Sequence, residues 1–206
     1  MATWPVPVPG SVISAGVTPP SSTWRVWLAP RWNRSRRTPP TRSSGRWSGG
    51  ALLGVPGLLA YRAVNTLDAM VGHRSARYER FGWAAARIDD LANLLPSRLS
   101  AGLATVLAPV VGGQPRAALR VWRRDGYKHP SPNAGPVEAA FAGALGRTLG
   151  GRLAYAGRVE DRPLLGDGPA PGVADVARAA RLSLAVTLGA GVAAVATRLL
   201  LDRARA

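Results

Sequence analysis

One helical pattern covers residues 62–72. Its polar positions recur at steps of three or four residues and so share roughly one face: Arg62, Asn65, Asp68 and Gly72. An apolar face lies beside them, formed by Leu59, Ala63, Leu67 and Met70. The pattern predicts a helix that ends near Gly72 and His73.

A second helical pattern covers residues 79–95. One stripe contains Ala86, Asp89 and Asn93, and another contains Ile88, Leu91 and Leu95. We expect Pro96 to break or kink this helix, because proline has no N–H to donate to the preceding turn.

Two uncharged stretches are candidate membrane spans. Residues 99–115 lie between Arg98 and Arg116, but Pro109 and the Gly112–Gly113 pair weaken this candidate. Residues 182–201 are stronger: 182–197 carry no charge, and Arg198 can extend toward the membrane surface. Twenty residues of helix measure about 30 Å, which matches a bilayer core. The alternative for this stretch is a buried helix of a soluble bundle.

Residues 116–172 are polar and rich in loops. Pro136 is suited to the first position of a helix that would run to about residue 149. The sequence after it predicts turns and short extended pieces.

Residues 1–48 have a different character. They hold eight of the prolines and five of the seven tryptophans, and no helical or strand period persists. Pairs such as Pro19–Pro20 and Pro39–Pro40 disfavour both helix and central strand. We therefore expect this segment to be disordered, and it lacks the apolar core of a signal peptide.

The formal charge of +16 is unevenly distributed. Residues 1–48 contain seven arginines and no acid, so residues 49–206 carry 20 basic residues against all 11 acids, a net charge of +9. That excess suits an anionic substrate or anionic lipids. The absence of cysteine excludes disulfides and thiolate chemistry, and two histidines make a histidine-rich metal site untenable.

Three polar stretches are candidates for chemistry. The face of Arg62, Asn65 and Asp68 could bind substrate or a metal–phosphate group, or it could be a structural pair or solvated face. Asp89 and Asp90 point about 100° apart on a helix, so only one should face a given site; either could bind Mg²⁺, or both could be ordinary surface charges. The third stretch is a turn-rich loop that could bind phosphate, or it could be an ordinary solvated basic loop. Its polar residues are Arg123, Arg124, Lys128, His129, Ser131 and Asn133.

These stretches carry a family resemblance. The sequences AYRAVNTLDAMVGH, YERFGWAAARIDDLANLLPSRL, WRRDGYKHPSPNAGPVEAAFAGALG and GGRLAYAGRVEDRPLLGDG resemble the adenosylcobinamide-phosphate synthases, also called CbiB/CobD-type cobalamin-biosynthesis proteins. The resemblance covers about residues 49–203. It implies a multi-pass protein of the cell membrane that joins adenosylcobyric acid to aminopropanol, or its phosphate, through an ATP-dependent amide bond.

The resemblance also implies a set of partners and site residues. ATP would act as cosubstrate and Mg²⁺ as the metal. The corrinoid and aminopropanol (phosphate) would be the substrates. Membrane lipid and other membrane enzymes of the cobalamin pathway would be partners, and no nucleic acid is expected. Asp68, Asp89 and Asp90 are predicted catalytic residues, with Asp68 and Asp89 as metal ligands. Predicted phosphate- or substrate-binding residues are Arg62, Asn65, Lys128, His129, Ser131 and Asn133.

The chain departs from the family before residue 49. There the family carries apolar membrane segments and a motif of the form E-S-x-x-E-N-x-x-D, whereas residues 31–50 read RWNRSRRTPPTRSSGRWSGG. One permitted set of codons for this string, read in a neighbouring frame, encodes VESVAENTADAVVGPLVWG, which contains the motif. We therefore expect a reading-frame shift in this segment and low or no activity of the chain as written.

The sequence as a whole predicts a mostly α-helical fragment of an integral membrane protein with a disordered N-terminal arm. The alternative function is that of a basic membrane- or nucleic-acid-binding protein without catalysis, which the Arg- and Trp-rich arm would support. A structural two-span membrane protein is a third possibility, but it leaves the polar loop unexplained.

Overall fold

The computed structural model describes residues 39–71, 79–155 and 158–205. These residues are mostly helical, as the sequence predicts. The elements in chain order are α2 (Pro39–Val71), α3 (Glu79–Ala92), α4 (Leu94–Val106), the 3₁₀ helix η2 (Ala108–Val111), α5 (Pro115–Asp125), α6 (Ala134–Leu145), strands β1 (Leu149–Tyr155) and β2 (Arg158–Leu165), and α7 (Val173–Arg205).

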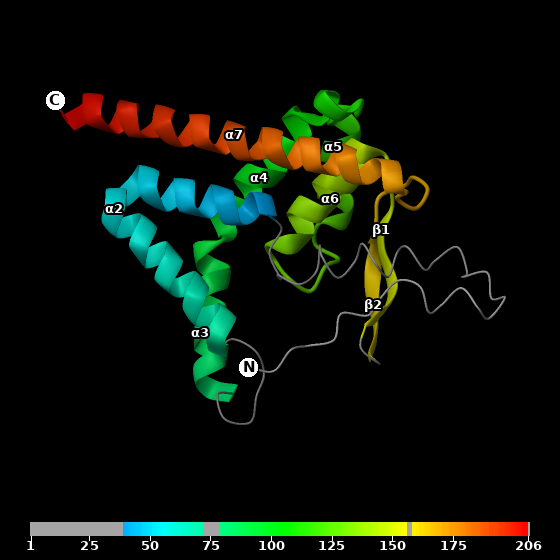
Figure 1. Cartoon of the computed structure of the whole chain (residues 1–206), viewed down its shortest axis with the longest axis horizontal. Coiled ribbons are helices and arrows are strands. Elements are labelled where there is room, and N and C mark those ends of the chain that lie inside the picture. Colours follow the sequence, from blue (N-terminus) through cyan, green and yellow to red (C-terminus); the bar gives the residue numbers. More distant parts are fainter. Residues whose placement is uncertain (1–38, 72–78, 156–157, 206) are drawn as a thin grey trace, which may run out of the picture.

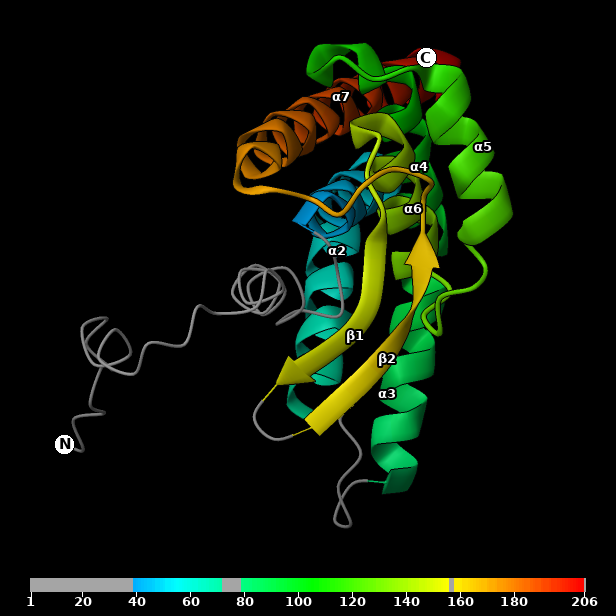
Figure 2. The ribbon, with the colours of Figure 1, turned by 90° about the vertical axis from the view of Figure 1, so that its right-hand side faces the viewer.

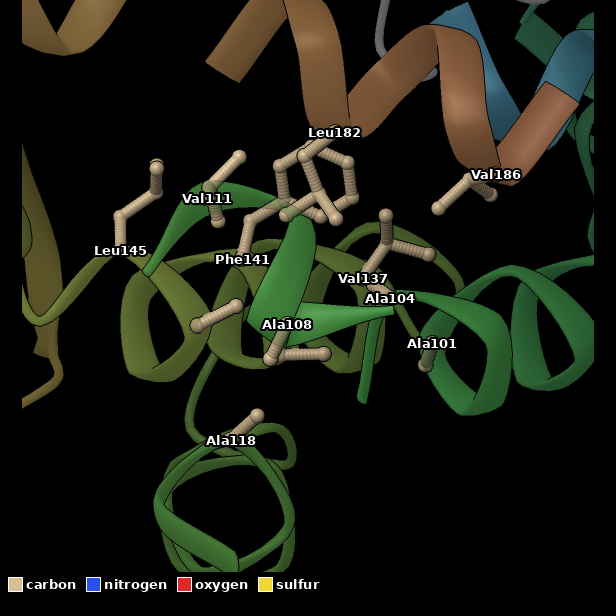
Figure 3. Close-up of a cluster of buried hydrophobic side chains, with 12 residues drawn as sticks. Ala101, Ala104, Ala108, Val111, Ala118, Val137, Phe141, Leu145, Leu182 and Val186 are labelled. Atoms are coloured by element: carbon tan, nitrogen blue, oxygen red, sulfur yellow. The ribbon is translucent and has the colours of Figure 1, made fainter. Parts of the chain in front are cut away.

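Helix α6 is the centre of the core. Eleven of its twelve residues are buried, because α4, α5, η2 and α7 all pack around it. Its alanines and glycine make this possible by letting neighbouring backbones approach: a Cβ on Gly143 would lie 2.7 Å from the Cα of Ala118 on α5. Phe141 and Val137 project from α6 toward Leu182 and Val186 of α7 (Figure 3).

Helix α7 runs through the predicted span 182–201 and beyond it. Within the described part of the chain it is the one helix long and apolar enough to cross a membrane, and 11% of its apolar window is buried. Leu182, Val186 and Ala190, four residues apart, form its buried stripe. Membrane insertion of the chain therefore has support from one helix.

A clamp of ion pairs fixes the start of α7. Asp175 forms an ion pair with Arg147, whose Nε lies 2.7 Å from Asp175 Oδ2, and it accepts from Arg178 Nη1 at 2.8 Å and from the Gly172 N–H at 2.9 Å. These donors hold the pKa of the buried carboxyl below its usual range despite the opposing effect of burial. Arg178 also donates to the Val111 carbonyl at 2.8 Å, which ties α7 to the end of η2.

The second predicted span, 99–115, is wrong as a continuous helix. The chain forms α4, then η2, and turns at Gly112, whose φ is 73°. Ala101, Ala104 and Ala108 are fully buried against the protein. Part of this uncharged stretch therefore packs within the protein through small side chains.

Helix α2 bends at Gly54, whose φ of 65° and ψ of −147° interrupt the helical backbone. Its first part lies beside α7 and its second part runs down beside α3 (Figure 1). The helix begins at Pro39, so residues 39–48 are helical rather than disordered. The proline pair is accommodated because the first turn of a helix has no use for its N–H groups. Residues 1–38, in the rest of the predicted arm, lie outside the described residues.

Several predicted boundaries move by a few residues. The break expected at Pro96 occurs at Asn93, and Pro96 sits in the first turn of α4. Helix α2 ends at Val71, next to the predicted end, and His73 lies outside the described residues. Helix α6 begins two residues before Pro136 and ends at Leu145, because Gly146 adopts a left-handed φ of 63°.

The extended pieces predicted after α6 form one antiparallel hairpin of β1 and β2. The strand pairing slips between Leu149 and Gly151, where Gly150 and Gly151 both have positive φ. In Figure 2 the hairpin extends away from α7, along the side of the helices. The end of β2 returns to α5 and so borders the loop that carries the third polar stretch.

Candidate functional site

The loop between α5 and α6 is held in shape by its own side chains. The Ser131 N–H donates to His129 Nδ1 at 3.0 Å, and the Ala134 N–H donates to Ser131 Oγ at 3.2 Å. The second bond supplies an acceptor to an otherwise unsatisfied N–H at the start of α6. His129 and Ser131, both predicted to bind phosphate, therefore also build the loop.

Asp125 anchors the base of this loop. It is fully buried and accepts from Arg124 Nε at 2.9 Å and Nη2 at 2.7 Å, from Lys128 Nζ at 2.7 Å and from the Gly166 N–H at 2.9 Å. The Arg124 guanidinium, with help from Lys128 and Gly166, holds the pKa of Asp125 well below its usual range and raises the pKa of Arg124 itself. The bond to Gly166 joins the loop to the end of β2.

The two cations on Asp125 remain accessible. The side chains of Arg124 and Lys128 are 45% and 51% exposed, and Arg124 also pairs with Asp167 at 2.7 Å. Lys128, a predicted phosphate ligand, is thus held in position by a buried carboxylate while half of it faces outward. Such an arrangement can present a positive charge to an anion with little loss of side-chain freedom.

Asn133 joins the second and third polar stretches. Its Nδ2 donates to the Asp90 carbonyl at 2.8 Å and to Asp90 Oδ1 at 3.3 Å. Its Oδ1 accepts from Ser97 Oγ and from Arg98 Nη1, both at 3.1 Å. Arg98 also donates to the Pro132 carbonyl at 3.0 Å. The amide therefore connects the loop to both α3 and α4.

The first stretch reaches the second through Tyr61. Tyr61 Oη donates to Asn93 Oδ1 at 2.8 Å, and Asn93 Nδ2 donates to Asp89 Oδ2 at 3.1 Å. All three residues are buried. Asp89 thus faces α2 while Asp90 faces the loop, which confirms that the adjacent carboxylates point to different surroundings.

The remaining predicted residues lie further along α2. Arg62 is exposed, and Asn65 and Asp68 are half-buried. Within the part of the chain that the structure describes, no group of three histidine or acidic side chains is placed to hold a metal ion. Asp68 and Asp89 would therefore need phosphate or water oxygens to complete a Mg²⁺ site, as that ion commonly uses. Their role as metal ligands stays a prediction.

Sequence reasoning did not single out several members of this network. They are Tyr61, Ser97, Arg98 and Asp125, together with Glu138, whose Oε2 lies 3.9 Å from His129 Nε2. Tyr61 and Ser97 lie within or beside the polar stretches, but their spacing does not distinguish a bridging side chain from a surface one. Asp125 and Glu138 carried a better signal, since each is an acid in a setting that would leave it buried: one beside two arginines, the other within an apolar helix.

Known proteins are similar to the part of the chain that contains this site. Residues 48–183 match the family model described as CobD/Cbib protein. The chain is 61% identical over 142 residues to the cobalamin biosynthesis protein CobD of Mycobacterium tuberculosis, which covers 69% of this chain and 45% of that relative. For the proteins of the same name from Geobacter metallireducens and Rhodobacter capsulatus, identity is 55% over 114 residues and 50% over 151 residues. The Geobacter match covers 55% of this chain and 36% of that relative, and the Rhodobacter match covers 71% of this chain and 47% of that relative.

The chain spans about half the length of the curated relatives it matches. No solved structure matches it. The matched region contains all three polar stretches and the hydrogen bonds that join them. On this evidence the chain belongs to the CobD/CbiB family, whose curated members are named cobalamin biosynthesis proteins.

Proposed function

We propose that the intact protein joins adenosylcobyric acid to aminopropanol, or to its phosphate, by ATP-dependent amide formation at the cell membrane. The observation that supports this most is the meeting of three separated polar stretches. Tyr61, Asn93 and Asp89 form one hydrogen-bonded set, and Asp90 and Asn133 form the next. The half-exposed Lys128, held by Asp125, lies in the same loop as Asn133, five residues earlier in the chain.

The arrangement suits an acyl-phosphate route. Lys128, oriented by Asp125, would neutralise the phosphates of ATP, with Arg62 and Asn65 contributing from α2. Asp68 and Asp89 would bind Mg²⁺ on the phosphate oxygens, and Asp90 would hold the loop through Asn133. Charge neutralisation and positioning supply most of the rate enhancement in phosphoryl transfer, so these groups match what the reaction requires.

Helix α7 supports the membrane location. Its outward apolar side chains would contact lipid, and the large exposed apolar area of α2 would face either lipid or the preceding part of an intact enzyme. Loss of the family motif before residue 49 would leave this surface uncovered and the site incomplete. The chain as written would then be inactive.

Complementation tests the proposal. A bacterial strain lacking the synthase receives this chain, a version in which the reading frame before residue 50 is restored, and the restored version carrying Lys128→Met. We expect only the restored version to support cobalamin-dependent growth at the full rate. Growth at that rate with Lys128→Met would remove Lys128 from the site.

The same strain separates function from expression. Immunodetection of each variant in the membrane fraction shows whether a negative result reflects absent protein. Failure of the restored version to form adenosylcobinamide, while it is present in the membrane, would contradict the proposed reaction.

A further inference from the structure

Glu138 is the acid that the proposed phosphate site leaves unused. It lies one turn into α6, between Val137 and Ala139, both of which are fully buried. Its side chain is 16% exposed. A carboxylate in such surroundings costs free energy unless charged or polar groups face it. Its presence on the most buried helix of the protein therefore calls for a specific neighbour.

Among the residues that the structure describes, two charged or titratable groups act on Glu138. His129 Nε2, from the loop before α6, lies 3.9 Å from Glu138 Oε2, and Arg162 of β2 acts on it electrostatically. Burial is the larger influence and raises the pKa of Glu138 to about 7, while Arg162 opposes the rise. A carboxyl group of this kind can gain or lose a proton near neutral pH.

The His129 ring is oriented for this neighbour. Its Nδ1 accepts from the Ser131 N–H, so in the neutral ring the proton resides on Nε2, on the side of Glu138. The side chain is 9% exposed. Gly135 packs against it closely, since a Cβ at that position would come within 2.8 Å of His129 Cβ. Loop packing therefore fixes both the tautomer and the direction of the ring.

We infer that His129 and Glu138 form an acid–base pair beneath the cationic loop, which accepts the proton released by the substrate ammonium group during amide formation and shares that one proton between the two side chains. This inference rests on the proposed function. The ammonium of the amino alcohol would give its proton to the pair. The freed nitrogen lone pair would then attack the carbonyl carbon of the acyl phosphate that ATP provides.

The remaining steps conserve atoms and charge. As the C–N bond forms, the C–O bond to phosphate breaks, phosphate leaves with the bonding electrons, and it takes the second proton of the amine nitrogen. The pair returns its proton to solvent through the exposed edge of the loop. A separation of 3.9 Å would need to shorten on substrate binding, as is common for such contacts.

The two histidines of the chain make a direct test possible. With His73→Gln, the imidazole signals in a ¹⁵N NMR titration of the full chain in detergent micelles report on His129 alone. We expect Glu138→Gln to move the midpoint of that titration down by about 1 pH unit, because the carboxylate stabilises the imidazolium. Asp202→Asn, which removes an exposed acid at the far end of α7, is the matched control and should leave the midpoint unchanged.

An unchanged His129 midpoint in Glu138→Gln would overturn the pair. Should that variant fail to fold by circular dichroism, the reciprocal measurement remains. Infrared titration of the Glu138 carboxyl in His129→Gln should then show an altered midpoint, and an unaltered one would overturn the pair as well. Neither measurement depends on catalysis.

Kinetics of the frame-restored enzyme tests the chemical role. Glu138→Gln should lower kcat at least tenfold and remove the rise of kcat between pH 6 and 8, with the KM for ATP unchanged. A wild-type pH profile in this variant would overturn the role in proton transfer. If the restored enzyme forms no amide at all, the proposed function falls, while the NMR result still decides whether the pair exists.

Discussion

Helices α6 and α7 are both apolar, but they differ in how much of their surface is buried within the protein. All but one of the residues of α6 are buried within the protein, whereas α7 buries a single stripe and exposes Leu184, Leu188, Val192 and Val195. The difference follows from where the neighbouring elements lie. Four elements, α4, α5, η2 and α7, surround α6, while the elements that contact α7 leave much of its surface exposed. Hydrophobicity alone thus does not say whether protein or lipid covers a helix.

Removing a large side chain from the α6 core should have the largest effect. Phe141 is fully buried between α6 and α7, so Phe141→Ala should lower the free energy of unfolding by about 4 kcal/mol. Leu188→Ala on the exposed face of α7 is the matched control and should change it by less than about 0.5 kcal/mol. Denaturation in detergent, followed by circular dichroism, measures both. Equal losses would mean that α7 is packed as α6 is.

A charge on the outer face of α7 should reveal what covers it. Val192 is 71% exposed and lies near the middle of the span, so Val192→Arg should disfavour membrane insertion by about 3 kcal/mol. We expect the variant to shift from the membrane to the soluble or aggregated fraction on cell fractionation. Arg181→Lys, at the edge of the span, keeps the charge pattern and should fractionate as the wild type does. Unaltered fractionation of Val192→Arg would show that lipid does not contact this face.

The ion pairs at Asp125 hold the loop that borders the core. Asp125→Ala should lower the free energy of unfolding by about 2 kcal/mol, because four donors lose a charged acceptor. The pKa of Asp125 is lower in the folded protein than the usual 3.8, so its stabilising effect is present above that value and is lost as pH falls below it. Unfolding measured at pH 3 and pH 7 should therefore differ less in Asp125→Asn than in the wild type.

Glu138 should give the opposite pH dependence. Its pKa is raised from 4.5 to about 7 in the folded protein, so its contribution to stability is present below pH 4.5 and is lost as pH rises through 7. Glu138→Gln should thus be more stable than the wild type at pH 8, by up to about 3 kcal/mol, and equal to it at pH 4. Thermal unfolding at the two pH values checks the crossover; a parallel shift at both would contradict burial of the charged form.

The sequence predicts where helices lie better than where they end. The helical pattern at 62–72 ends within one residue of the end of α2, the pattern at 79–95 covers α3 and continues past its end at Ala92, and 182–201 lies inside α7. Residues 99–115 misled because alanine, glycine and valine are equally compatible with lipid and with a close-packed core. The start of α2 at Pro39 was missed because a proline pair ordinarily breaks a helix, whereas the first turn of a helix tolerates proline.

The polar network was predictable in part. That Asp89 and Asp90 have different surroundings follows from their 100° separation on a helix, and the structure bears this out. The bond between Asn133 and Asp90 joins residues 43 positions apart, so it depends on how α3, α4 and α6 pack. Spacing along the chain carries no information on that packing. The pairing of His129 with Glu138 was hidden for the same reason, since a loop and the following helix turn back on each other there.

The clamp at Asp175 determines how deeply α7 could lie in a membrane. It fixes α7 to η2 and to the turn after α6, seven residues before Leu182, where the uncharged stretch begins. At 1.5 Å per residue, this places the clamp about 10 Å from that point along the helix. With Leu182 at the lipid boundary, the carboxylate would sit at headgroup level. The ion pairs of the clamp would then lie outside the hydrocarbon layer, where their charges cost least.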